Sequence, residues 1–587
     1  MKLFFLLLIF SITFVGKIKS QSLISKISPD LEKKLINSSN NEKIKVWIYF
    51  TDKGGNLEKF YNEPLKVVSE KSIKRHQKLN KESILDFSDL PVNNDYVEQV
   101  VSNGFNIKHK SKWFNAISGF ATKEQINKIL RFSFVNRVDL VKGFSKSKND
   151  MEFNETPIIE NRFVQPEKLF SLNYGNSFMQ NNLINVPAVH NLGYDGSGIT
   201  ICVMDAGFNN LAHTVFDSMN IIATWDFVNG DPNVGDEGDM GNGSHGTYVL
   251  SVLGGYAPGN LIGPAYRSNY ILAKTENTDS ETPVEEDNWV AALEWADSIG
   301  VDITSTSLGY LEYDPPYTSY TWQNMDGNTA IITIAGDLAV KKGIIVVNSA
   351  GNEGWRSTPN SLIAPADGDS IFAIGAVNSS GLRTSFSSFG PTVDGRIKPD
   401  FMAMGSGVVS ARASNQTQYT FVSGTSFSCP LVSGAIALLL QANPNLNPIQ
   451  IRGILRQTSS RSNNPDNFYG WGIINTLLAL NVILKVDNSF IPDDFILYQN
   501  YPNPFNPSTT INWHSPVGSW ITIKLYDVLG REIETIVDGY YDAGNHSTLY
   551  IINSTLPSGV YFYQLKVVDN STGNVVYKDT KKMMLMK

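Results

Sequence analysis

Residues 199–207 read ITICVMDAG, an apolar run that ends in an acid and a glycine. The apolar and β-branched side chains before Asp205 predict a buried strand, with the aspartate at its carboxyl end. Taken alone, such an aspartate is typical of a strand that ends in a turn. Two later segments suggest a second interpretation, because they supply a base and a hydroxyl in similar glycine-flanked settings.

The base and the hydroxyl are His245, in GSHGT at 243–247, and Ser426, in SGTSFSCP at 423–430. A serine hydroxyl is hardly ionised at neutral pH, so it attacks a carbonyl only when an imidazole takes its proton. The imidazole needs a carboxylate that fixes its tautomer and stabilises its charged form. Asp205, His245 and Ser426 are therefore the candidate catalytic residues, although a loop histidine and a helix cap would explain the last two motifs singly.

A fourth segment, VVNSAGNEG at 346–354, lies between the base and the nucleophile. Negative charge develops on the carbonyl oxygen when an amide is attacked, and fixed donors must meet it. The Asn352 side chain and the backbone N–H of Ser426 are the predicted donors of this oxyanion hole. Ser426 would open a helix through residues 431–440, with Pro430 early in that helix. A turn asparagine is the simpler explanation of Asn352 alone.

The order of acid, base and nucleophile, with the residues around each, resembles the subtilisin-like serine proteases, or subtilases. Four further segments match landmarks of that family: 194–198, 386–390, 398–400 and 469–475. The resemblance implies a three-layer α/β fold with a mainly parallel sheet, and peptide-bond hydrolysis through an acyl-enzyme on Ser426. It also implies that substrate pairs with the chain as an added strand. The substrate-binding residues would be Ser307, Leu308, Gly309, Ala350 and Gly351.

Three positions depart from the family pattern. Phe427 follows the serine where Met is usual, and Met404 stands where Ala-Pro-Gly is usual. Ala206 replaces a hydroxylated residue, so one hydrogen bond that would orient Asp205 is expected to be missing. No catalytic group is lost, so these changes bear on rate and specificity and not on the type of reaction.

The two cysteines, Cys202 and Cys429, flank the acid and the nucleophile in sequence. We expect two small buried thiols, although a disulfide is compatible with an exported protein. The resemblance implies no cofactor for catalysis, and structural calcium without assigned ligands. The acidic loop at 231–239 has no EF-hand spacing, so a solvated loop is the simpler interpretation and no metal ligand is assigned.

Lys2 precedes an apolar run at 3–15, and small and basic residues follow to position 20. The run is shorter than the roughly 20 residues that span a bilayer, so we predict a signal peptide at 1–20. We expect no later stretch to be long or apolar enough to span a membrane.

Residues 21–170 are predicted to form a separate α+β region. Strands at 45–50, near 106, at 113–120 and at 135–141, with a helix at 123–131, indicate a ferredoxin-like unit. The segment FNAISGF at 114–120 resembles a subtilase prodomain, which would inhibit the enzyme and help it to fold. An unrelated binding domain is the alternative. A linker and processing zone is expected at 146–166.

A basic run within this region is predicted to be a solvated helical face. Its members are Lys66, Lys71, Lys74, Arg75, Lys78 and Lys81.

The region 491–587 carries the motif YPNPFNP at 501–507, inside a segment that resembles the sorting domains of type IX secretion in Bacteroidetes-like bacteria. Its prolines favour an extended edge, and alternating patterns at 521–527 and 556–567 predict a β-sandwich. A carbohydrate-binding or generic sandwich is the alternative. The expected route is through the periplasm to the medium or the cell surface.

The chain of 587 residues is long enough for two to four domains, and its net charge of -8 argues against nucleic acid as a partner. We therefore expect a signal peptide (1–20), a prodomain with linker (21–170), a protease domain (171–487) and a sorting domain (491–587). The predicted function is a secreted serine endopeptidase. Expected partners are polypeptide substrates, the prodomain itself and outer-membrane type IX machinery. A catalytically idle surface binding protein is the alternative; a lipase fits less well, because no Gly-x-Ser-x-Gly surrounds Ser426.

Overall fold

The computed structural model describes residues 26–586, apart from 56, 80–83, 142, 145–169, 237–242, 277–283, 314–318, 490–494, 501–502, 516–518, 542–543, 553–555 and 569–574. The predicted signal peptide and the predicted linker at 146–166 lie outside the described residues. Contacts divide the chain into two compact units, one up to Asn481 and one from Val482.

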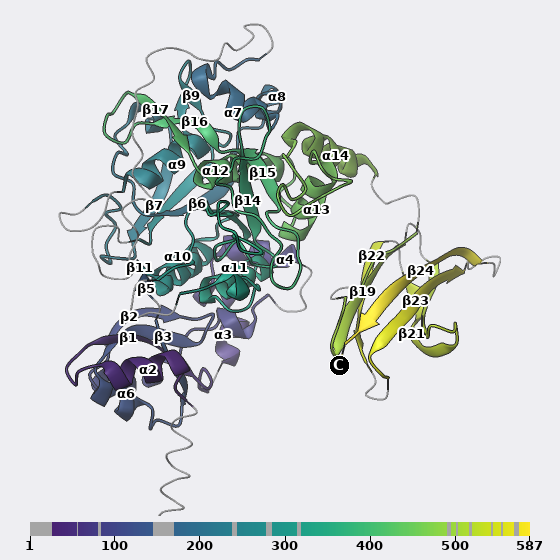
Figure 1. The fold of residues 1–587 in the computed structure, drawn as a ribbon, viewed down its shortest axis with the longest axis horizontal. Coiled ribbons are helices and arrows are strands. Elements are labelled where there is room, and N and C mark those ends of the chain that lie inside the picture. The colour runs from purple at the N-terminus through teal and green to yellow at the C-terminus, as the bar shows by residue number, and fades with distance from the viewer. Residues whose placement is uncertain are drawn as a thin grey trace, which may run out of the picture. The chain divides into compact units, whose positions relative to one another are not determined.

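The first unit is built on seven parallel strands in the order β15–β14–β13–β12–β6–β10–β7 (Figure 1). Most of these strands are buried along their whole length, and apart from β12, which reads ITST, their sequences are mainly apolar without a regular alternation. Their bounds are β6 (Thr200–Asp205), β7 (Asn220–Asp226), β10 (Asn269–Lys274), β12 (Ile303–Thr306), β13 (Ile345–Ser349), β14 (Phe372–Val377) and β15 (Phe401–Met404).

Two pairs of helices cover opposite faces of this sheet. Cys202 of β6 packs against α10 (Glu286–Ile299) and α11 (Ile331–Lys341) in one apolar cluster. Ser305 of β12 faces the other way, where it contacts Ser433 of α12 (Thr425–Ala442). The helix α9 (Ser244–Gly254) packs on α12. Two layers of helices around a parallel sheet confirm the predicted three-layer fold.

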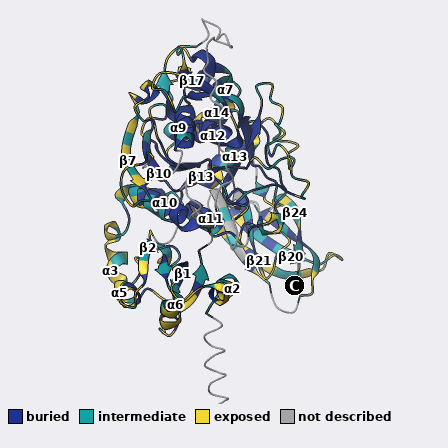
Figure 2. Cartoon of the chain, turned by 60° about the vertical axis from the view of Figure 1, so that its left-hand side comes forward, coloured by how far each residue is buried: buried dark blue, intermediate teal, exposed yellow. Residues whose placement is uncertain are grey.

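Among the described residues, one helix, α12, is long and apolar enough to cross a membrane. The expectation that no later stretch has this composition was therefore wrong. The cause is the depth of the helix within the domain: 89% of its apolar window is buried, and it is dark blue in Figure 2. A helix that is apolar all round is expected at the centre of a large domain.

The N-terminal region has the order β1 (Ile44–Phe50), α5 (Asn94–Ser102), β2 (Asn106–Ser111), β3 (Ala116–Ala121), α6 (Lys123–Ile129) and β4 (Val135–Leu140). Its strands form an antiparallel sheet in the order β2–β3–β1–β4. This is the predicted ferredoxin-like arrangement. A further helix, α2 (Pro29–Asn37), precedes β1, and α3 (Glu58–Asn62) and α4 (Glu70–Gln77) lie between β1 and α5.

Lys81 of the basic run lies outside the described residues, and the rest of the run, on and around α4, is only partly solvated. The side chains of Lys66 and Lys74 are 57% and 67% exposed, as expected. Arg75, however, is 3% exposed, so the prediction of a solvated face is wrong for this residue. The physical reason is that carbonyl and carboxylate oxygens of the domain with the seven-stranded sheet accept hydrogen bonds from the guanidinium group of Arg75.

The second unit consists of two antiparallel sheets. One contains β18 (Ile496–Leu497), β19 (Ser508–Ser515) and β22 (Gly544–Ile551); the other contains β20 (Ser519–Tyr526), β21 (Glu532–Tyr541), β23 (Gly559–Val568) and β24 (Val575–Leu585). Both sheets contribute to one core, in which Trp513 and Leu565 are fully buried. This is the predicted sandwich. Phe505 of the proline-rich motif pairs with the edge strand β24 through the N–H of Phe505 and the carbonyl of Met584, 2.9 Å apart.

Candidate active site

The acid and the base come from adjoining elements. Asp205 is the last residue of β6, and His245 lies in the first turn of α9. The Nδ1 atom of His245 is 2.6 Å from Oδ1 of Asp205, and the two residues are 4% and 0% exposed. A carboxylate on Nδ1 fixes the orientation of the imidazole and leaves Nε2 to act on a second group.

The two oxygens of the Asp205 carboxylate differ in their surroundings. Oδ1 also accepts a hydrogen bond from the N–H of Ala206, at 2.8 Å. Oδ2 is buried and has no hydrogen-bond partner among the residues that the structure describes. We expected Asp205 to lack one hydrogen bond, because Ala206 replaces a hydroxylated residue, and the unpaired Oδ2 agrees with this expectation. An unpaired buried acceptor carries a desolvation cost of about 1–3 kcal/mol.

The candidate nucleophile stands at the second position of α12. The hairpin of β16 (Ser406–Ala411) and β17 (Tyr419–Ser423) leads into Gly424, whose φ of +151° suits a glycine. Ser426 is 7% exposed, and its Oγ donates to the carbonyl of Ser307 at 3.2 Å. The ring of Phe427 lies 5.9 Å from the ring of His245, so the base is beside the first turn of α12.

Pro430 lies early in α12, as expected, but inside it and a full turn beyond the nucleophile, where a missing N–H leaves a carbonyl unpaired within the helix. Because proline has no N–H, the carbonyl of Ser426 lacks its usual donor four residues later. The hydroxyl of Ser307 supplies that donor, at 2.7 Å from the Ser426 oxygen. Ser307 and Ser426 therefore exchange two hydrogen bonds, which connect the end of β12 to the start of α12. From the sequence we expected Ser307 to contribute only to substrate binding, and its structural role was not foreseen.

The side chain of Asn352 is oriented by Thr425. Oδ1 of Asn352 accepts from the N–H of Thr425 at 2.9 Å and from its hydroxyl at 3.0 Å. A main-chain N–H can only donate, so the oxygen of the amide must face Thr425 and its NH₂ group must face away. Thr425 also accepts from the N–H of Gly351, at 3.3 Å. Sequence reasoning missed this role; the signal was a hydroxylated residue directly before the candidate serine.

The expected substrate-binding residues lie at the ends of two neighbouring parallel strands. Ser307, Leu308 and Gly309 follow β12, while Ala350 and Gly351 follow β13. Because carboxyl ends of parallel strands share one edge, the structure brings these residues together with Ser426.

A pocket of about 670 Å³ adjoins this edge at Gly309 and Glu353. Arg356 lies in it between two carboxylates, 2.9 Å from Glu312 and 2.8 Å from Glu353. Its remaining lining combines aromatic and aliphatic side chains (Leu311, Tyr313, Tyr320, Trp322, Leu362 and Ile363) with polar ones (Ser319, Thr321, Gln323, Thr358, Asn360 and Ser361).

Cys202 and Cys429 are buried, as expected, and free in the structure. They face opposite sides of the sheet, Cys202 toward α10 and Cys429 within α12, where its Sγ is 3.5 Å from the carbonyl of Thr306. Burial raises the pKa of the Cys429 thiol to about 12. In the part of the chain that the structure describes, no three His, Cys, Asp or Glu side chains are grouped to hold a metal ion. Glu237 and Asp239 of the acidic loop lie outside that part.

Comparison with known proteins identifies the family of this chain. Residues 196–472 match the model of the subtilase family. Subtilisin E of Bacillus subtilis (strain 168) is 30% identical over 354 residues, which is 60% of this chain and 82% of that protein. The chain belongs to the subtilase family. Other similar subtilases are subtilisin DY of Bacillus licheniformis, 33% identical over 299 residues (51% of this chain, 96% of the relative), and an alkaline protease of Alkalihalobacillus alcalophilus, 30% identical over 297 residues (50% and 68%).

Two further matches concern the flanking regions of this subtilase. Residues 45–155 match the peptidase S8 propeptide domain of Bacteroidota, and residues 499–579 match the secretion system C-terminal sorting domain. Both resemblances seen in the sequence are thereby confirmed. The protein is a secreted or surface-attached serine peptidase that carries a propeptide.

Proposed function

We propose that this subtilase is a serine endopeptidase that cleaves polypeptides through an acyl-enzyme on Ser426. The observation that carries the proposal is the 2.6 Å pair of Asp205 and His245 beside the first turn of α12. Asp205 would orient the imidazole, His245 would act as general base and then general acid, and Ser426 would be the nucleophile.

In the proposed reaction the Ser426 hydroxyl turns from the Ser307 carbonyl and gives its proton to Nε2 of His245. Its oxygen bonds to the substrate carbonyl carbon, and the carbonyl electron pair moves onto the oxygen. The NH₂ of Asn352 and the N–H of Ser426 stabilise that charge. When the intermediate collapses, the amine leaves with the proton from His245, and a water molecule then releases the acyl group by the same steps.

Substrate would bind as an extended strand along residues 307–309 and 350–351. Backbone pairing of this kind needs no free chain end, which supports cleavage within a chain. The pocket at Gly309 and Glu353 would receive a large side chain, since its volume is about 670 Å³, its walls include aromatic residues and Arg356 is paired with carboxylates. The chemistry uses only groups of the chain itself and needs no cofactor.

We further propose the boundaries and the route of export. A signal peptide at 1–20 would direct the chain to the periplasm, and the propeptide with its linker would occupy 21–170. The protease domain would extend over 171–487. The sorting domain at 491–587 would then engage outer-membrane type IX machinery.

The test is Ser426→Ala in the full chain. Both proteins are freed of the propeptide by the same added protease, and cleavage of peptides blocked at both ends is then measured. We expect turnover to fall about a millionfold, as in subtilisin. Ser433→Ala, two turns along the same helix, is the control and should keep its activity. Equal cleavage by Ser426→Ala and the parent would reject the proposal, and no cleavage by the parent would favour an idle binding protein.

A further inference from the structure

The propeptide carries a segment that its ferredoxin-like sheet does not require. Residues 57–92, here called the arm, lie between β1 and α5 and contain α3 and α4. The arm has a small apolar core of its own, in which Val68, Leu85 and Leu90 are buried. The described part of the arm is therefore an extension of the propeptide with a core of its own.

Arg75 of α4 extends from the arm into the protease. Nε donates to the carbonyl of Lys342 at 3.0 Å, Nη1 donates to the carbonyl of Val301 at 2.6 Å, and Nη2 bonds to the Asp297 carboxylate. These acceptors lie at the carboxyl ends of α10 and α11. Helix carboxyl ends present unpaired carbonyls and partial negative charge, so they attract a cation. We call this set of acceptors the guanidinium socket.

Around the socket, the arm and the protease each contribute polar or charged groups that pair with groups of the other. Asp297 also accepts from the arm at its main-chain carbonyl, which is 2.6 Å from the hydroxyl of Ser72. The protease in turn contributes Lys342, whose ammonium is 2.6 Å from Asp89 of the arm. Lys342 and Asp89 are each 1% exposed at the side chain. Buried charge pairs with matched partners specify one docked arrangement and slow its dissociation.

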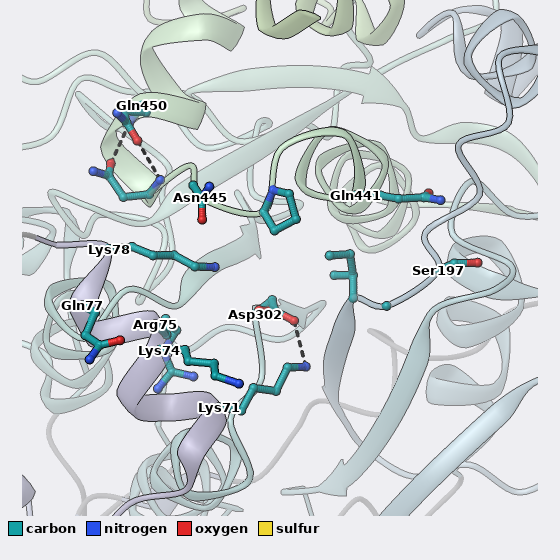
Figure 3. A pocket seen from close by; sticks show the side chains of 14 residues that line it. Lys71, Lys74, Arg75, Gln77, Lys78, Ser197, Asp302, Gln441, Asn445 and Gln450 are labelled. Carbon is teal, nitrogen blue, oxygen red and sulfur yellow. Dashed lines mark hydrogen bonds and ion pairs between the residues drawn. The ribbon is translucent and has the colours of Figure 1, made fainter. Parts of the chain in front are cut away.

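The two lysines of α4, Lys71 and Lys74, are placed differently (Figure 3). A pocket of about 790 Å³ lies beside them, with Gln441 on its far side. Lys71 is 3.1 Å from Asp302 but its side chain is 41% exposed, and Lys74 is 67% exposed. Exposed pairs contribute about 1 kcal/mol or less. The buried fork of Arg75 is therefore the strong contact of α4, and Lys74 is a matched control on the same helix.

The socket lies at the opposite edge of the sheet from the proposed catalytic groups. Val301 and Lys342 shortly precede the amino ends of β12 and β13. Asp205 and Ser307 stand at the carboxyl ends of β6 and β12. In a parallel sheet the amino ends of the strands lie on one side and their carboxyl ends on the opposite side. Cleavage chemistry at one edge leaves the arm contact at the other edge intact.

We propose that the guanidinium socket is the docking surface for the arm, and that Arg75 retains the propeptide on the protease after the covalent link between them is cut. The partner that the socket fits is a helix bearing a buried arginine. The proposal rests on the proposed function only in assuming that the propeptide is separated from the protease domain by cleavage.

The test uses the full chain with Ser426→Ala, so that it does not cleave itself, and a recognition site for an added protease within 146–166. After the cut, the rate at which the propeptide leaves is measured on an immobilised protease unit. We expect slow release for the parent and roughly hundredfold faster release for Arg75→Ala. Arg75→Lys should also release quickly, since an ammonium cannot replace the planar fork. Lys74→Ala should behave as the parent.

A second pair of variants covers the case in which Arg75→Ala does not fold. Asp297→Asn, on the protease side, should also speed release, and combining it with Arg75→Lys should add less than the sum of the two effects. Immediate release by the parent, or equal release rates for the parent, Asp297→Asn and either Arg75 variant, would overturn the proposal. The readout is binding in a Ser426→Ala background, so its outcome does not depend on whether Ser426 is the nucleophile.

Discussion

The amide of Asn352 depends on one neighbour for its orientation. Thr425 fixes Oδ1 through two hydrogen bonds, and the NH₂ group is thereby directed to the other side. Asn352→Ala should lower kcat about a hundredfold to a thousandfold with little change in KM, because the donor matters mainly in the transition state. Asn352→Asp keeps the acceptor for Thr425 but loses the donor, so it should lose activity as well. Substantial activity in Asn352→Asp, measured by steady-state kinetics, would contradict the assigned role.

Glu294 should make the affinity of the propeptide for the protease depend on pH. It accepts from the hydroxyl of Ser111 and from the N–H of Lys112 at 2.9 Å, and burial raises its pKa to about 7 from an ordinary 4.5. Removal of the propeptide returns this carboxylate to water, so the higher pKa belongs to the bound state. The bound state therefore holds the proton more tightly, and propeptide affinity should fall as pH rises from about 4.5 to 7.

The measurement is the release rate of the cut propeptide between pH 5 and 8. We expect release to become faster by up to about tenfold per pH unit below pH 7, and then to level off. Glu294→Gln should flatten this dependence. The same slope in Glu294→Gln as in the parent would show that other groups carry the pH dependence.

Between elements, the exchange of hydrogen bonds between Ser307 and Ser426 compensates for Pro430 in α12. Ser307→Ala should leave the Ser426 carbonyl without a donor and lower the free energy of unfolding by about 1 kcal/mol or more. Pro430→Ala, added to Ser307→Ala, restores a main-chain N–H and should recover part of that loss. Denaturant unfolding of the single and double variants checks this; losses that simply add would show that the two residues are not coupled.

The elements also show where sequence reasoning succeeds. The buried strands were predictable because apolar runs such as β6 have few other stable environments. The segments of Asp205, His245 and Ser426 were predictable because each contains glycine close to the proposed catalytic residue. The burial of Arg75 was not predictable, because its acceptors at Asp297 and Val301 come from a distant part of the chain. The role of Thr425 was missed for a related reason: a threonine between a glycine and a serine has no pattern of its own.

At the scale of the whole molecule, the second unit has its own core, and the proposed catalytic groups all lie in the first unit. Deletion of 491–587 should therefore leave a precursor that matures and cleaves peptides at the normal rate. Without the sorting domain it should remain in the periplasm. Cell fractionation with activity assays measures this. Full yield of the truncated enzyme in the medium would eliminate the sorting role, and weaker action on large insoluble substrates would favour a binding tail.

The most direct measurement of the central claim is labelling with a fluorophosphonate probe, which reacts with an activated serine, followed by peptide mapping. With the propeptide removed, we expect one label per molecule, located on Ser426 and not on Ser423 or Ser428. Labelling should fall sharply in His245→Ala, since the hydroxyl then has no base. An unlabelled Ser426 in the folded, propeptide-free protein, or a label on another serine, would contradict the account.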